Sequence, residues 1–230
     1  MPALASLAQV QTTTATDQVF QALYSAIITL ELAPGSKVSE AEIARNLGVS
    51  RQPVRDAFYR LSELGFMLIR PQRATTITYI SEQALLDARF IRTALEVECM
   101  RTAISKITDD DILRLEGLIN QQEAAIKADD RLGFHALDDE FHEVICEIAG
   151  HPNAWNLIHE QKVHLDRVRY LSLAFGAKSA LDDHRAIMQC IRDRDPDGAE
   201  QQLRIHLARI LNILEQVSAS HPELMESQQK

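Results

Sequence analysis

The stretch that decides the fold is LGVSRQPVRDA, residues 47–57. It follows a short helix predicted at residues 40–47, where Ser39 stands at the N-cap and Glu42 three residues later completes a capping-box pattern. Gly48 stands where a helix C-terminal cap is favoured. Ser50 then stands at the N-cap of a second helix, with Pro53 in its first turn, where a missing N–H costs little. Two short helices joined by such a turn predict a helix-turn-helix.

The segments on either side of this motif complete a small domain. Residues 17–32 have helical periodicity, whereas residues 66–70 and 75–80 are rich in β-branched and aromatic side chains. The last two runs are separated by the turn PQRA and predict a two-stranded wing. We therefore expect a winged helix-turn-helix over residues 16–80, preceded by a disordered tail at residues 1–15.

The remainder of the chain has the pattern of an all-helical domain over residues 81–220, followed by a short C-terminal tail at 221–230. Gly176 is taken as a break between two of its helices. The predicted fold class is mainly α, a winged helix-turn-helix followed by a bundle of about six helices. The predicted helices span about 82–106, 109–128, 131–149, 153–175, 179–193 and 196–218.

The distribution of charge favours a DNA-binding N-terminal part. The whole chain has a net charge of −9, which by itself argues against a nucleic-acid partner. Residues 1–80, however, hold seven Lys or Arg against six Asp or Glu, and residues 45–73 hold six arginines against two acids. A small basic segment on an acidic body is typical of a DNA-reading domain.

Other bulk features bound the class of protein. No apolar run is long enough to span a bilayer, and the N-terminus lacks the pattern of a secretory signal. The three cysteines are odd in number and far apart, which predicts neither a disulfide framework nor a thiolate zinc site. We expect a cytoplasmic protein without a membrane partner.

The second helix of the motif is expected to lie in the major groove of double-stranded DNA and present its first residues to base edges. Arg51 and Arg55 share one face, and an arginine that binds guanine bidentately contributes about 1–3 kcal/mol of discrimination. Ser50 and Gln52 are expected to read a base or bind a phosphate, and Arg45 and Arg73 to bind phosphates. The simpler interpretation is that these arginines only form a solvated surface. The expected DNA contacts are Arg45, Ser50, Arg51, Gln52, Arg55 and Arg73.

Four polar side chains fall on or beside apolar helix stripes of the bundle. Asp138 and His142 are spaced i, i+4, while His184 and His206 lie on two later helices. A single such histidine is more often a satisfied core residue, but three that converge with a carboxylate suit a divalent metal ion. The predicted cofactor is Zn²⁺, with Ni²⁺ or Mn²⁺ as alternatives.

The motif at residues 47–57 resembles the core motif of the GntR superfamily of transcriptional regulators, and the match continues through Leu61 and Gly65. Three departures concern Asp56, where glutamate is common, Ala74, where the wing usually carries a glycine, and Ala41, where a longer polar residue is often found. The second departure makes a tight backbone approach to the minor groove unexpected.

The later part of the chain resembles the FadR-like branch of that superfamily, with a helical ligand domain often called FCD. The motifs that carry this likeness are Arg92-x-x-Leu95-Glu96, Asp138-x-x-x-His142, Asp183-His184 and His206. The resemblance implies a metal held by Asp138, His142, His184 and His206. It also implies a small organic acid as effector, bound by the metal and by Arg92, with Arg169 as a second candidate. The alternative for Arg92 is a simple ion pair with Glu96.

We therefore expect a homodimeric transcriptional regulator that binds a palindromic operator. Its affinity for that operator is expected to fall or rise when a small carboxylate binds. The helices at residues 81–106 and 161–175 are candidates for the dimer seam. Two alternatives remain open at this point. The ion itself could be the signal, or the metal could activate water in an enzyme, although no general base is placed by motif.

Overall fold

The computed structural model describes residues 14–226, without the side chains of 173–175. The tail predicted at residues 1–15 therefore lies almost wholly outside the described residues. The described chain divides into two compact units, residues 14–27 with 31–78, and residues 28–30 with 79–226. Each unit is described by itself.

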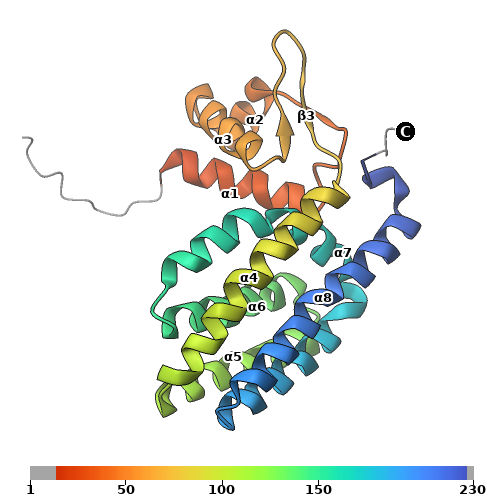
Figure 1. Cartoon of the computed structure of the whole chain (residues 1–230). Coiled ribbons are helices and arrows are strands. Elements are labelled where there is room, and N and C mark those ends of the chain that lie inside the picture. Colours follow the sequence, from red (N-terminus) through yellow and green to blue (C-terminus); the bar gives the residue numbers. More distant parts are fainter. Residues whose placement is uncertain (1–13, 227–230) are drawn as a thin grey trace, which may run out of the picture. The chain divides into compact units, whose positions relative to one another are not determined.

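The first unit is a helix-turn-helix with a small antiparallel sheet (Figure 1). The sheet has the order β1-β3-β2, and β3 pairs Thr76 with Lys37 on one side and with Leu68 on the other. The elements are α1 (Ala15–Ile28), β1 (Lys37–Val38), α2 (Glu40–Leu47), α3 (Arg51–Glu63), β2 (Met67–Leu68) and β3 (Thr75–Ile77).

Two local expectations of the first unit are corrected. Helix α1 ends at Ile28 rather than residue 32, and Leu30 already has a left-handed backbone with φ 64°. The predicted wing of two strands is a sheet of three, because the two-residue strand β1 also pairs with β3. A strand that short has no alternation from which it could be predicted. The cap at Gly48 is confirmed: its φ is 68°, and its N–H reaches the carbonyls at the end of α2.

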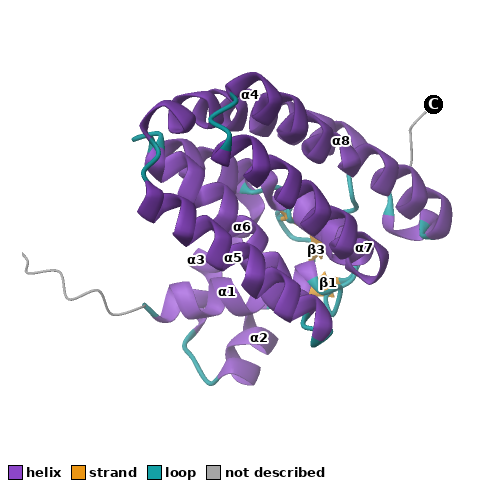
Figure 2. Cartoon of the chain, turned by 90° about the horizontal axis from the view of Figure 1, so that it is seen from below, coloured by secondary structure: helices purple, strands orange, loops and turns teal. Residues whose placement is uncertain are grey.

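The second unit is a bundle of long helices, seen from below in Figure 2. Helix α7 packs along α8 and α4 and also contacts α5 and α6, so it lies at the centre of the unit. Side chains cap four of the helix starts and accept backbone N–H groups there, as a helix N-terminus requires. The helices are α4 (Glu82–Lys106), α5 (Asp109–Lys127), α6 (Arg131–Ile148), α7 (Pro152–Arg192), α8 (Pro196–Ser220) and the 3₁₀ turn η1 (Pro222–Leu224).

The break predicted at Gly176 is wrong. Helix α7 runs without interruption from Pro152 to Arg192, so the two helices predicted at residues 153–175 and 179–193 are one. A single interior glycine costs a helix only about 1 kcal/mol relative to alanine. Buried residues on either side, such as Val168 and Leu181, offset that cost by packing in the bundle core.

None of the described helices is apolar over a length that would cross a membrane.

Candidate functional site

The start of helix α3 presents polar side chains on one face and packs the other. Val54, Phe58 and Leu61 are buried in the first unit, which fixes the rotation of the helix. Arg51 and Arg55 therefore point outward, with side chains 62% and 45% exposed. This is the arrangement that a recognition helix needs, because its exposed face must enter a groove.

Both of these arginines contact one carboxylate. Glu40 of α2 places its Oε2 atom 3.4 Å from Arg51 Nη2, and 3.3 Å and 3.2 Å from Arg55 Nε and Nη2. Gln52 donates from Nε2 to Asp56 Oδ1 at 2.8 Å. The motif analysis did not single out Glu40, because a pairing across the turn between two helices leaves no periodic signal.

The remaining predicted DNA contacts are exposed. Arg45 lies on α2 and Arg73 in the turn between β2 and β3. Ser50 is the N-cap residue of α3, but its side chain accepts no capping hydrogen bond. In the wing turn the left-handed position belongs to Gln72, with φ 58°, and not to Ala74. The departure of Ala74 from the family pattern therefore does not strain this turn.

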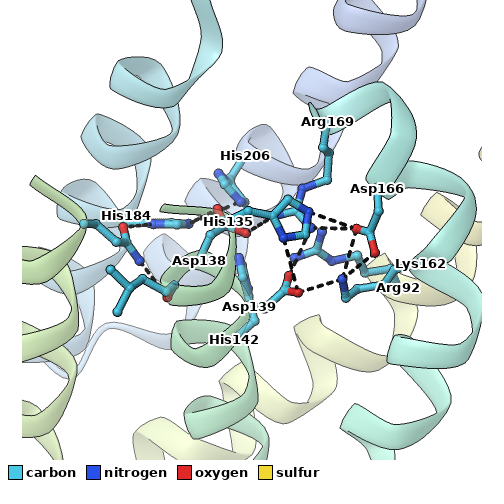
Figure 3. A network of polar contacts seen from close by, with 12 residues as sticks. Arg92, His135, Asp138, Asp139, His142, Lys162, Asp166, Arg169, His184 and His206 are labelled. Atoms are coloured by element: carbon cyan, nitrogen blue, oxygen red, sulfur yellow. Dashed lines mark hydrogen bonds and ion pairs between the residues drawn. The ribbon is translucent and has the colours of Figure 1, made fainter. Parts of the chain in front are cut away.

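In the second unit, the four predicted metal ligands come together. Asp138, His142, His184 and His206 each offer one ligand atom, and these atoms all lie within 4.8 Å of one another. Two ligands come from consecutive turns of α6, one from α7 and one from α8 (Figure 3). The first three are buried and the side chain of His206 is 9% exposed. The spacing of apolar residues along each helix predicted which face carries each of these residues. The packing of α6, α7 and α8 brings those faces together.

Each of the three histidines has an oxygen atom beside its Nδ1 atom. His142 Nδ1 lies 2.7 Å from Glu96 Oε2, and His206 Nδ1 lies 3.4 Å from Asp183 Oδ2. His184 Nδ1 lies 2.8 Å from the side-chain oxygen of Gln122. Oxygen atoms at these positions favour the tautomer with the ring proton on Nδ1, which leaves the Nε2 lone pair free, the usual arrangement of metal-ligating histidines.

In that tautomer the Nε2 atoms face one another without protons between them. His184 Nε2 and His206 Nε2 are 3.4 Å apart. His142 Nε2 is buried and has no hydrogen-bond partner among the described residues. Burial lowers the pKa of both His184 and His206 below the ordinary value, so both rings are neutral near pH 7. Facing lone pairs repel unless a cation lies between them, so the donor set fits a divalent metal ion.

The fourth ligand, Asp138, is ionised. Burial alone would raise its pKa, but the charge of Arg169 holds it well below the ordinary value. Its Oδ1 atom lies 3.5 Å from His184 Nε2, while Oδ2 accepts a hydrogen bond from Arg169 Nη2. One carboxylate oxygen thus faces the histidines and the other faces a guanidinium.

Arg169 belongs to a buried network of acids and bases between α6 and α7 (Figure 3). Its Nη1 atom also donates to Asp139 Oδ1 at 3.0 Å and to Asp166 Oδ1 at 3.2 Å. Lys162 lies 2.7 Å from Asp139 Oδ2 and 2.9 Å from Asp166 Oδ2. Burial raises the pKa of Asp166, but Lys162 and His135 outweigh it and hold this pKa well below the ordinary value. This network was not predicted from the sequence, although the i, i+4 spacing of Lys162 and Asp166 was a signal for it.

A cavity of about 300 Å³ opens beside the candidate metal ligands. Asp138 and His206 line it together with the basic side chains Arg89, Arg92, Arg169 and Arg209. Arg92 is 5% exposed and forms the predicted alternative pair with Glu96. That pair uses Nε and leaves Nη2 buried without a hydrogen-bond partner among the described residues. An unsatisfied buried guanidinium N–H is costly, and an anion in the cavity would satisfy it.

Comparison with known proteins gives two family matches. Residues 15–77 match the family described as bacterial regulatory proteins, gntR family, and residues 87–209 match the FCD domain. These matched segments contain the helix-turn-helix and all four candidate metal ligands.

Individual proteins agree with these matches. The HTH-type transcriptional repressor RspR of Escherichia coli (strain K12) is 36% identical over 202 residues, which are 87% of this chain and 89% of that protein. An HTH-type transcriptional regulator in an unstable DNA locus of Streptomyces ambofaciens is 29% identical over 221 residues, 95% of this chain and 92% of that one.

A solved structure extends the agreement to the fold. The structure of E. coli McbR/YncC, 20% identical, has a TM-score of 0.76 and covers 89% of this chain and 99% of its own. The relatives are named as transcriptional regulators and not as enzymes. The chain therefore belongs to the GntR family of bacterial transcriptional regulators, with an FCD domain that follows the helix-turn-helix in the sequence.

Proposed function

We propose that this transcriptional regulator binds operator DNA through Arg51 and Arg55 and that a small organic acid, held at or near a divalent metal ion in the FCD domain, controls that binding. One observation carries the proposal. Two of the candidate metal ligands, Asp138 and His206, line the same cavity as Arg92, and the Nη2 atom of Arg92 is buried without a hydrogen-bond partner among the described residues. An acid in this cavity would lie beside the proposed metal ion and beside Arg92.

The residues divide this work between them. Asp138, His142, His184 and His206 would hold the ion, and Zn²⁺ suits three imidazoles and a carboxylate best, with Ni²⁺ or Mn²⁺ as alternatives. A bound divalent ion would act as a Lewis acid that attracts a carboxylate oxygen of the effector. Arg92 adds a hydrogen bond and a positive charge, and its own partner Glu96 holds it in place. Arg169 lines the cavity too, but its Nη1 and Nη2 donors already contact carboxylates.

On the DNA side, the proposal is a homodimer that binds a palindromic operator. Two recognition helices must match two half-sites at a fixed spacing, so a small reorientation lowers affinity. A tenfold change in operator affinity needs only about 1.4 kcal/mol of coupling to the effector. Exposed Arg45 and Arg73 are proposed to contact DNA phosphates, and Ser50 and Gln52 a base or a phosphate.

The test is a thermal-shift screen of small carboxylates on zinc-loaded protein, followed by gel shifts with each acid that raises the melting temperature. The diagnostic variant is Arg92→Lys, which keeps the charge beside Glu96 but removes the Nη2 donor. Arg101→Lys is the matched control on the same helix, since Arg101 is exposed and pairs with Asp197 and Glu200. The acid should bind Arg92→Lys more weakly than the wild type and should bind Arg101→Lys as tightly as the wild type. If no carboxylate binds, or if a bound acid leaves DNA affinity unchanged, the effector proposal is wrong.

A second candidate function has a specific observation in its favour. Four protein ligands are enough to complete a tetrahedral shell, as in structural zinc sites, which would leave no position for an acid. The ion itself would then be the signal. Titration of zinc in the absence of organic acids, with operator affinity as the readout, separates the two functions. A change with zinc alone supports the second function, and a change only with an acid supports the first.

A further inference from the structure

The recognition helix carries one feature that its DNA contacts do not explain. A single oxygen, Glu40 Oε2, accepts from Arg51 Nη2 and from both Nε and Nη2 of Arg55. Glu40 lies in the first turn of α2, and its side chain is 26% exposed. A negative charge beside a DNA-binding surface repels phosphates, so on affinity alone this position would favour a neutral or basic residue.

The contact with Arg55 is made by one edge of the guanidinium. Nε and Nη2 form the side edge, and both point at Glu40. The end edge of the group, formed by Nη1 and the second hydrogen of Nη2, is left for another partner. Bidentate recognition of guanine O6 and N7 needs two parallel N–H donors on one edge. The carboxylate therefore holds the group by the edge that a base contact at the end would not use.

Together these contacts suggest a role in specificity. We propose that Glu40 is a positioning residue that fixes the Arg55 guanidinium for a base and keeps it, together with Arg51, from binding backbone phosphates in many orientations. This inference rests on the proposed role of Arg51 and Arg55 in operator binding. Glu40 lowers the affinity for DNA of any sequence and raises the preference for the correct base.

The expected size of the effect follows from the exposure of the pair. Arg55 is 45% exposed, and solvent-exposed ion pairs change an equilibrium constant by at most about fivefold. Loss of Glu40 should therefore reduce discrimination at one base pair by about two- to fivefold. It should also strengthen binding to random-sequence DNA, because the surface gains one net positive charge.

The test compares Glu40→Gln with a matched control on the same helix. Glu42→Gln removes the same charge from an exposed residue of the first turn of α2, for which the described structure shows no arginine partner. The probes are the duplex that the wild-type full-length protein selects from a randomised DNA pool, and single-base variants of it. Arg55→Ala first identifies the base pair that Arg55 reads, as the position where this variant loses preference. Fluorescence anisotropy then gives the dissociation constants, and melting temperatures show that each variant is folded.

In the expected result, Glu40→Gln loses preference at the base pair that Arg55 reads and keeps it elsewhere, while Glu42→Gln keeps preference at every position. The inference is overturned if Glu40→Gln discriminates as well as the wild type. It is also overturned if both glutamine variants lose the same preference, because the effect would then be one of charge alone. If Arg55→Ala loses no base preference, the proposed recognition role fails and this inference fails with it; the effector proposal is untouched.

Discussion

Gln122 offers a sharp test of the metal centre, because it touches a ligand without being one. Its side-chain oxygen lies 2.8 Å from His184 Nδ1, and its Nε2 atom donates to the carbonyl of Leu137 at 3.0 Å. The second contact fixes which end of the amide faces the histidine. Gln122 is fully buried, so water does not replace it when it is removed. We predict that Gln122→Leu frees the His184 ring to place its proton on Nε2, where the metal should bind.

The size of the effect can be worked out from these contacts. Removal of a partner of a ligating histidine typically lowers metal affinity by about 10- to 100-fold. The metal-free protein should also lose about 1–3 kcal/mol of stability, because the buried Nδ1 atom of His184 is left without a hydrogen-bond partner in either tautomer. The carbonyl of Leu137 adds little to that loss, since it lies inside α6, where a helical hydrogen bond uses its other lone pair.

The neighbouring residue provides the control. Gln121 is exposed, and its Nε2 atom donates to the carbonyl of Gly117 on its own helix at 3.3 Å. Gln121→Leu makes the same chemical change one residue away without touching the centre. The assay is competition for zinc against a chromophoric chelator, with urea unfolding of each metal-free variant. If Gln122→Leu binds zinc within about twofold of Gln121→Leu, the proposed orientation of His184 is wrong.

Three further predictions concern the second unit. The double variant His184→Ala with His206→Ala should abolish stoichiometric zinc, as measured by metal analysis after desalting; one ion retained per chain would rule out the proposed site. Gly176→Ala should raise the stability by about 0.5–1 kcal/mol in urea unfolding, because among the described side chains a Cβ there meets only Ser172, at 3.5 Å from Oγ and 3.8 Å from Cβ; a lower midpoint would contradict an uninterrupted α7. Asp195→Ala should cost about 1 kcal/mol, because the Asp195 side chain accepts the Gly198 N–H at the start of α8; unchanged unfolding would show that this cap contributes nothing.

Local chemistry is the reason why much of the first unit could be predicted from the sequence. Gly48 takes the left-handed conformation that ends α2, and the buried stripe of Val54, Phe58 and Leu61 sets the exposed face of α3. These signals act within a few residues of each other. Strand β1 and the contact of Glu40 with Arg55 could not be predicted in the same way, because both depend on partners at least fifteen residues away.

The cluster of four candidate metal ligands was predictable for a related reason, and its surroundings were not. Each ligand falls on or beside an apolar stripe of its own helix, so the sequence shows a polar residue where the helix faces the core. The partners that orient the rings have no such mark. Gln122 is 62 residues from His184, and its neighbour Gln121, an identical side chain, points to solvent. Only the packing of α5 against α7 decides which of the two reaches the centre.

Arg169 shows how this limit bears on the choice of effector contact. As a basic residue beside the bundle interior, it was a reasonable candidate from the sequence. In the fold its Nη1 and Nη2 atoms donate to Asp138, Asp139 and Asp166, whereas the Nη2 atom of Arg92 has no such partner among the described residues. An incoming anion would have to displace existing ion pairs at Arg169, but it would fill an unmet donor at Arg92. Arg169 binds Oδ2 of Asp138 and leaves Oδ1 facing His184. We therefore expect Arg169 to orient Asp138 for the proposed metal ion, and Arg92 to bind the organic acid.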